Sequence, residues 1–376
     1  MWLVAADRDA VEMPELWTVV HRVKAGLRRG STLGAGPLDA ALGVLDSDAP
    51  APPAVSARAH DRARTALAHL IGDPALEAAL QVRRADGREV LVPYRVVLAA
   101  DRLATAGVDG GERLLKATGG GPPTMTAYLL SMLATGRGPE AVDGLASAVA
   151  AHAKDANWLH RHLGVLSGVP GPATFVDDDG AALRLRQLGP TTCGPTCAIL
   201  MRMLLDPAYA LWLTTGEHLE PARSGDALPF EQRFRSQQHA VHEALTRRAL
   251  GPAPWPRALG SPPWALAAFL NRFTGLTGAQ FGWVPVDGDN PVQLRRCLDA
   301  VLRGVSAGVP VPVYIGRTVD RHVVLAIGSR GEAVVVYDPA AGAIVDVPLA
   351  DWEAGQVGIA GWDHLESVVV PRLLAF

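Results

Sequence analysis

A cysteine at the expected start of a helix is the residue of this chain best placed to do chemistry. Cys193 follows the loop from Gln187 to Thr192 and leads into the apolar stretch from Ala198 to Leu205. The free backbone N–H groups of a helix's first turn, together with the positive end of its dipole, stabilise a thiolate. This position lowers the pKa of a cysteine, so Cys193 is expected to be a nucleophile.

An imidazole and a carboxylate follow on two successive expected strands. His322 opens the apolar run 322–327, and Asp338 ends the run 333–338. If Ser329 to Gly331 form a three-residue hairpin loop, His322 falls directly opposite Asp338 and within reach of a hydrogen bond. A two-residue loop would put the two side chains on opposite faces of the sheet. The placement of Gly331 favours the three-residue loop.

These residue types suit acyl transfer through a thioester. Cys193 is the expected nucleophile, and His322 is expected to deprotonate it and later to protonate the leaving group. Asp338 would fix the tautomer of the imidazole and stabilise its charged form. Gln187, six residues before the cysteine, is expected to donate a side-chain N–H to the oxyanion, with the backbone N–H of Cys193 as the second donor. A single buried cysteine is usually structural, so the prediction depends on the set of four.

The same four residues carry a resemblance to a known family. The Gln, five residues, Cys-Gly spacing, the later His-Val-Val-Leu strand and the Asp-Pro-x-x-Gly turn at 338–342 resemble the papain-like cysteine peptidases that remove double-glycine leaders from bacteriocins. The similarity covers roughly 184–205 and 317–347. It implies a papain-like catalytic fold and a protein or peptide substrate. It also implies an oxyanion role for Gln187 and catalytic roles for Cys193, His322 and Asp338. The interval between Cys193 and His322 is longer than the family needs, and the stretch 206–261 within it is interpreted as a lid or a specificity wall.

Three functions fit this set of residues. The first is a cysteine hydrolase that cleaves a peptide or isopeptide bond. The second is a glutamine deamidase or acyltransferase with the same triad, and either activity would suit a bacterial effector or toxin. The third is a non-enzymatic binding protein on a peptidase scaffold, against which the intact set of four residues counts. No cofactor is expected. Cys197, one helical turn after Cys193, is expected to be a packing residue, and no second close ligand pair completes a zinc site.

The composition limits the choice of partners and compartment. Of 376 residues, 49% are hydrophobic and 19% are charged, a balance typical of folded globular proteins. The net charge of −3 provides no basic field for nucleic acid. Three cysteines are too few for a disulfide framework, which favours a reducing compartment.

The N-terminal residues do not form a usual signal peptide. Their short apolar run has no basic segment before it and meets charge at Asp7 and Arg8. No window reaches the roughly 18 apolar residues that a membrane span needs. The chain is therefore expected to be cytoplasmic, or exported by a route without a conventional signal peptide.

The pattern of the chain changes near Val169 to Pro172, which predicts an α+β protein in two parts. Residues 1–170 are expected to be a mainly helical domain that recruits a substrate or partner protein, or serves export. Residues 171–376 are expected to form the catalytic domain with an antiparallel sheet. His152, His160 and His162 are expected on the surface of a polar helix. The elements expected in the first part are helices at 12–29, 57–81, 124–133 and 139–163 and an edge strand at 88–93.

Overall fold

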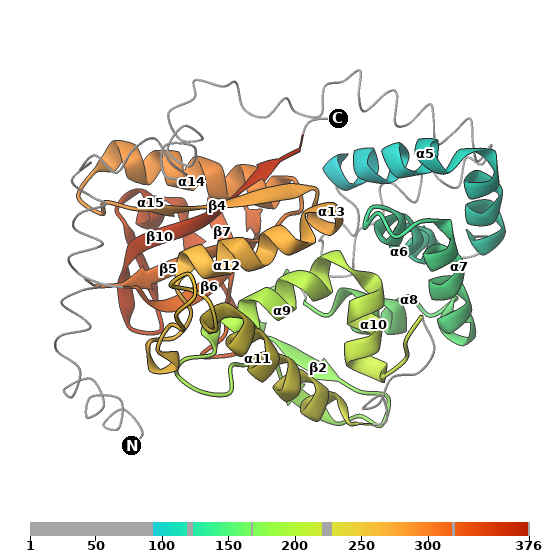
Figure 1. The fold of residues 1–376 in the computed structure, drawn as a ribbon, viewed down its shortest axis with the longest axis horizontal. Helices are drawn as coiled ribbons and strands as arrows, with labels where there is room; N and C mark the ends of the chain where they lie inside the picture. The colour runs from blue at the N-terminus through green and yellow to red at the C-terminus, as the bar shows by residue number, and fades with distance from the viewer. Residues whose placement is uncertain (1–92, 119–122, 167, 220–227, 318–319, 375–376) are drawn as a thin grey trace.

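The computed structural model describes residues 93–118, 123–166, 168–219, 228–317 and 320–374. The helices expected at 12–29 and 57–81 lie outside these residues, as does all but the last residue of the strand expected at 88–93. Pro93 begins a helix instead. In the described part, the chain is an α+β structure with helices packed around an antiparallel sheet, in agreement with the expected class (Figure 1).

One large antiparallel sheet forms the centre of the C-terminal half. Its strand order is β1-β8-β7-β6-β5-β10-β4, and β9 pairs with β10 outside this path. A separate two-stranded sheet joins β2 to β3. The strands are β1 (Gly171–Pro172), β2 (Thr174–Val176), β3 (Ala182–Arg184), β4 (Ala279–Pro285), β5 (Val311–Gly316), β6 (Asp320–Arg330), β7 (Ala333–Asp338), β8 (Ala343–Pro348), β9 (Gln356–Ile359) and β10 (Trp362–Leu373).

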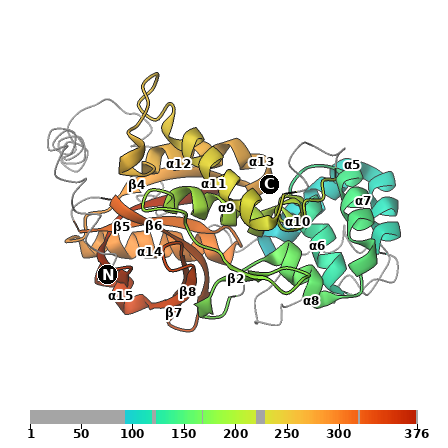
Figure 2. The ribbon, with the colours of Figure 1, turned by 90° about the horizontal axis from the view of Figure 1, so that it is seen from below.

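Helices cover both faces of this sheet (Figure 2). One face carries α9 (Cys193–Leu205), α11 (Phe230–Thr246) and α12 (Pro263–Leu270), and the other carries α14 (Pro291–Ser306) and α15 (Leu349–Glu353). Successive side chains of a strand point to opposite faces. Val323 and Leu325 of β6 accordingly join the apolar cluster under α9, while Val324 joins the cluster under α14. The central strands are buried on both sides, which explains their continuous apolar runs.

The described residues before 167 form helices. They are α5 (Pro93–Thr118), α6 (Pro123–Leu133), α7 (Pro139–Ala148), η1 (Ala150–His152), α8 (Ala156–Leu159) and η2 (His160–Gly164). The single helix expected at 139–163 is therefore broken. Asp155 begins a new helix because its side chain accepts the backbone N–H of Trp158 at 2.9 Å.

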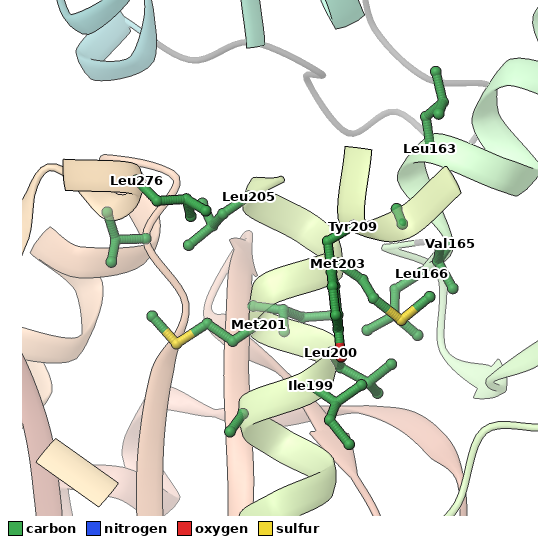
Figure 3. Close-up of a cluster of buried hydrophobic side chains, with 14 of the residues drawn as sticks. Leu163, Val165, Leu166, Ile199, Leu200, Met201, Met203, Leu205, Tyr209 and Leu276 are labelled. Carbon is green, nitrogen blue, oxygen red and sulfur yellow. The ribbon is translucent and has the colours of Figure 1, made fainter. Parts of the chain in front are cut away.

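The helical part and the sheet-bearing part share one continuous apolar cluster. Figure 3 shows Val165 and Leu166 beside Met203 of α9, close to Tyr209 of α10 (Pro207–Thr215), and Leu163 belongs to the same cluster. The chain enters the large sheet at β1, next to the predicted boundary. The two parts share this core. The division into domains of residues 1–170 and 171–376 stays a prediction.

The expectation of surface histidines is wrong for His162, which is 1% exposed. Its ring stacks on Trp158 at 4.2 Å between centroids and contacts Phe175 of β2 edge-on. Its Nε2 lies 3.2 Å from Asp178, and burial lowers its pKa to about 4 despite that carboxylate. The polar residues around His162 in the sequence did not indicate its burial, because the burial depends on β2 and the turn after it, which follow later in the chain.

No single helix of the described residues is long and apolar enough to cross a bilayer. One pair, α9 with α10, passes the same criteria of length and composition only when joined, and it is bent by 115°.

Candidate active site

Cys193 is the first residue of α9 and is 4% exposed. The N-terminus of α9 packs on β6, where Cys193 and Cys197, one helical turn apart, both contact Val323. Backbone N–H groups of Val323 and Gly194 point to the sulfur of Cys193, and the Cys197 thiol donates to the Val323 carbonyl at 3.5 Å. Cys197 therefore has a structural role, because its thiol joins α9 to the strand that carries His322.

The structure brings His322 and Asp338 together at one edge of the sheet. His322 Nε2 lies 2.7 Å from Asp338 Oδ1, and each residue is 4% exposed. Backbone N–H groups of Ala340 and Ala341 donate to the two carboxylate oxygens at 2.9 and 3.4 Å. The imidazole also forms a hydrogen bond with the Cys193 thiol. Because Nε2 is taken by Asp338, Nδ1 is the ring nitrogen left for the thiol.

The register of the β6–β7 hairpin differs from the one predicted. Arg330 pairs with Ala333, so the loop has two residues and the prediction of a three-residue loop is wrong. Such a loop alone would separate His322 from Asp338 by a sheet face. A β-bulge between Ala326 and Gly328 adds one residue to β6 and restores the even spacing. His322 and Asp338 thus become diagonal neighbours on one face rather than a directly opposed pair.

The charges of this group favour an ion pair between thiolate and imidazolium. Burial alone would raise the pKa of Cys193, but the hydrogen bond and charge of His322 outweigh it, so the pKa of the thiol is lowered. Burial pulls the pKa of His322 down, yet Asp338 and Cys193 raise it to about 9. Burial likewise works against ionised Asp338, and His322 keeps the pKa of that carboxyl low. The other two cysteines differ, since burial raises the pKa of Cys297 to about 12 and that of Cys197 well above the usual value.

Gln187 lies beside the triad, in the turn that leads to Cys193. Its backbone N–H donates to Pro339 O at 2.8 Å, which ties it to the residue after Asp338. Its Nε2 donates to Gly189 O at 2.8 Å, and the backbone N–H of Thr192 reaches the same oxygen at 3.2 Å. A carboxamide has two N–H groups, so one remains for an oxyanion. The structure thus ties the backbone of Gln187 to the residue after Asp338, and the oxyanion role of its side chain stays a prediction.

Sequence reasoning missed Ser261, which lies under the start of α9. A Cβ built on Gly194 would lie 3.1 Å from Ser261 Cβ, so a larger residue after Cys193 would crowd Ser261. Tyr314 of β5 holds this segment by donating to the Ser261 carbonyl at 3.1 Å. The only signal in the sequence was the Ser-Pro-Pro start of α12, which predicts a helix but not a neighbour.

The interval 206–261, interpreted as a lid or specificity wall, contributes to the core in its described residues. It contains α10, α11 and η3 (Arg257–Leu259). Side chains of α11, among them Phe234 and Gln238, are buried where the helix packs along α9. The helix α11 is therefore part of the folded core rather than a lid.

Among the described residues, no group of three or more His, Cys, Asp or Glu side chains is arranged to hold a metal ion. Comparisons with protein-family models, with curated proteins and with solved structures gave no match to this chain. The function must therefore be argued from the arrangement of Cys193, His322, Asp338 and Gln187.

Proposed function

We propose that this protein is a cysteine hydrolase that cleaves an amide bond, in a peptide or an isopeptide, through a thioester. The observation that carries the proposal is the contact of Cys193 with His322, whose other ring nitrogen is 2.7 Å from Asp338. A thiol of lowered pKa paired with an imidazole of raised pKa is the state in which a cysteine attacks a carbonyl at neutral pH.

The reaction follows from the positions of these groups. The Cys193 thiolate adds to the carbonyl carbon. The oxyanion that forms accepts hydrogen bonds from the Gln187 side chain and from the Cys193 backbone N–H. The His322 imidazolium gives its proton to the leaving amine as the C–N bond breaks, leaving a thioester. Neutral His322 then takes a proton from water, the hydroxide attacks the thioester, and the carboxylic acid leaves with Cys193 again a thiolate. Asp338 holds the imidazole and its charge through both steps.

A papain-like catalytic domain with a protein or peptide substrate is part of the same proposal. Its support is the arrangement of a cysteine at the start of a buried helix, packed on an antiparallel sheet whose strands carry the histidine and the aspartate. The spacing of Gln187 and Cys193 and the Asp-Pro-x-x-Gly turn add to that support.

Alkylation by iodoacetamide at pH 6, followed by mass spectrometry, tests the proposal. We expect Cys193 to be labelled well before Cys197 and Cys297, because its pKa is lowered and theirs are raised. The His322→Ala variant should lose this preference. Equal and slow labelling of all three cysteines would exclude the hydrolase and favour a binding protein on a peptidase scaffold.

A further inference from the structure

The buried side-chain amide of Gln238, on α11, forms hydrogen bonds with the residues on either side of Gln187, the proposed oxyanion donor. Gln238 is 0% exposed, and its Oε1 accepts the backbone N–H of Leu188 at 2.9 Å. Its Nε2 donates to Arg186 O at 3.2 Å. Arg186 and Leu188 are the residues immediately before and after Gln187, so the backbone of Gln187 is clamped from both ends.

The same amide reaches the helix of the nucleophile. Gln238 Oε1 also accepts the hydroxyl of Thr196 at 3.0 Å, and Thr196 lies in the first turn of α9. One side chain therefore fixes the distance between the Gln187 turn and the N-terminus of α9. The contact with Thr196 is buried and the other two bonds are partly buried. The Leu188 N–H also reaches Thr192 Oγ1 at 3.0 Å, and the Thr196 hydroxyl also reaches Thr192 O at 2.8 Å, so Thr192 shares in holding this turn and Arg186 O is the group that loses a side-chain donor without Gln238.

We propose that Gln238 is the positioning residue for the oxyanion donor Gln187 relative to Cys193. This inference depends on the proposed function, because it concerns the side-chain donor of the same oxyanion. Gln238 touches neither the substrate nor the thiol, and its effect is confined to steps that build negative charge on an oxygen. Donors to an oxyanion must be aimed before the reaction begins, so a loose turn would cost rate without changing the thiolate.

Two reagents separate these effects on Cys193. Acylation by p-nitrophenyl acetate passes through an oxyanion, whereas alkylation by iodoacetamide displaces iodide and forms no oxyanion. In the full chain, Gln238→Met should slow acetylation of Cys193 by about 10- to 100-fold, part of what a lost oxyanion donor costs. Its alkylation rate should stay within about twofold of the native rate, since the ion pair with His322 is untouched.

A neighbour on the same helix is a matched control. Gln237 accepts the hydroxyl of Tyr209 at 3.0 Å and does not contact the Gln187 turn. Gln237→Met should therefore leave both rates at the native level. Gln238→Glu keeps the two acceptor bonds but sets a carboxylate oxygen against Arg186 O in place of the donor, so it should slow acetylation even if Gln238→Met folds poorly.

A double variant decides whether Gln238 acts through Gln187. Once Gln187→Ala has removed the donor, adding Gln238→Met should slow acetylation no further. The inference is overturned if Gln238→Met acetylates at the native rate, if both reagents slow equally, or if the second substitution adds its full effect to Gln187→Ala. No acetylation of Cys193 in the native protein would instead overturn the proposed function along with it.

Discussion

At the scale of single residues, the chemistry of Cys193 depends on a positive charge that Asp338 maintains. The carboxylate accepts from His322 and holds the pKa of the imidazole near 9 against the effect of burial. The imidazolium in turn lowers the pKa of the thiol. The aspartate thus acts on the cysteine through the histidine.

The Asp338→Asn variant tests this dependence. Without the carboxylate, the pKa of His322 should fall and the thiolate should lose its partner, so alkylation of Cys193 at pH 6 should slow by roughly tenfold or more. The measurement is the iodoacetamide rate as a function of pH. Asp346→Asn, which removes a half-exposed partner of Arg330, is the control and should leave the rate unchanged. An unaltered pH profile in Asp338→Asn would contradict the assigned role.

The upper limit of the pH profile follows from His322. Acyl transfer needs the imidazolium as the proton donor, and that proton is lost as the pH rises through about 9. Because the pKa of His322 is raised, its charged form dominates below about pH 9 and is lost above that pH. Turnover of an amide substrate should therefore fall above pH 9, while alkylation of Cys193, which needs only the thiolate, should continue. Parallel decline of both rates would indicate unfolding instead.

At the scale of elements, the contact of His322 with Asp338 depends on a hairpin that the sequence described only in part. Alternating strands and a glycine-bearing loop predicted the hairpin itself. The bulge near Ile327 could not be predicted, because an extra residue is tolerated wherever packing on both faces allows it, and β6 is apolar without a break from Val323 to Ile327. Gln187 and Cys193 were easier, since they are neighbours in the chain and a helix start needs little tertiary information. Gln238 and Ser261 were missed because their partners are distant in sequence.

The Asp-Pro-x-x-Gly turn gives a second prediction at this scale. Gly342 has a φ of +58°, and a Cβ there would lie 2.6 Å from Arg184 Cγ and 2.8 Å from Leu185 O. Gly342→Ala should therefore push away the segment that leads to Gln187. We expect a loss of about 1–3 kcal/mol in the free energy of unfolding, measured with urea, and slower acetylation of Cys193.

A second glycine, Gly331, distinguishes the effect of backbone strain from the effect of steric contact with a new Cβ. Gly331 in the β6–β7 loop has a similar φ of +52°, but nothing lies within 4 Å of its built Cβ. Gly331→Ala should cost only the backbone strain, about 1–2 kcal/mol, and leave acetylation unchanged. If both variants acetylated Cys193 at the native rate, the turn at Gly342 would not be what places the Gln187 segment.

At the scale of the whole molecule, the helices before residue 167 complete the core on which α9 packs. Met203, Leu205 and Tyr209 belong to the same apolar cluster as Leu163 and Leu166 (Figure 3). A fragment of residues 171–376 would expose this surface to water. We expect it to aggregate, or to show weaker thermal unfolding cooperativity than the full chain, by circular dichroism. A stable and fully active fragment would contradict this and would also remove the proposed recruiting role of residues 1–170.

Arg95 of α5 joins the same two parts of the molecule through buried hydrogen bonds. Its guanidinium is buried and donates to Leu276 O and Leu205 O at 2.8 Å and to Ser131 O at 3.1 Å. These carbonyls belong to α6, the end of α9 and α13 (Thr274–Thr277), so a single side chain joins the helical part to the end of the catalytic helix. Burial lowers its pKa to about 10, with the charge of Asp206 acting in the opposite direction, so it remains charged at neutral pH.

Arg95→Ala should consequently destabilise the whole molecule and not just one helix. Three buried carbonyls would lose their donor, and at about 1–3 kcal/mol for each unsatisfied group the free energy of unfolding should fall by at least 3 kcal/mol. Arg113→Ala on the same helix removes only solvent-exposed pairs with Glu140 and Asp143 and should cost less than about 1 kcal/mol. Because α9 carries Cys193, Arg95→Ala should also unfold the site in the same urea transition as the helices. Separate transitions, with selective labelling of Cys193 retained after α5 unfolds, would show instead that the catalytic part is stable alone.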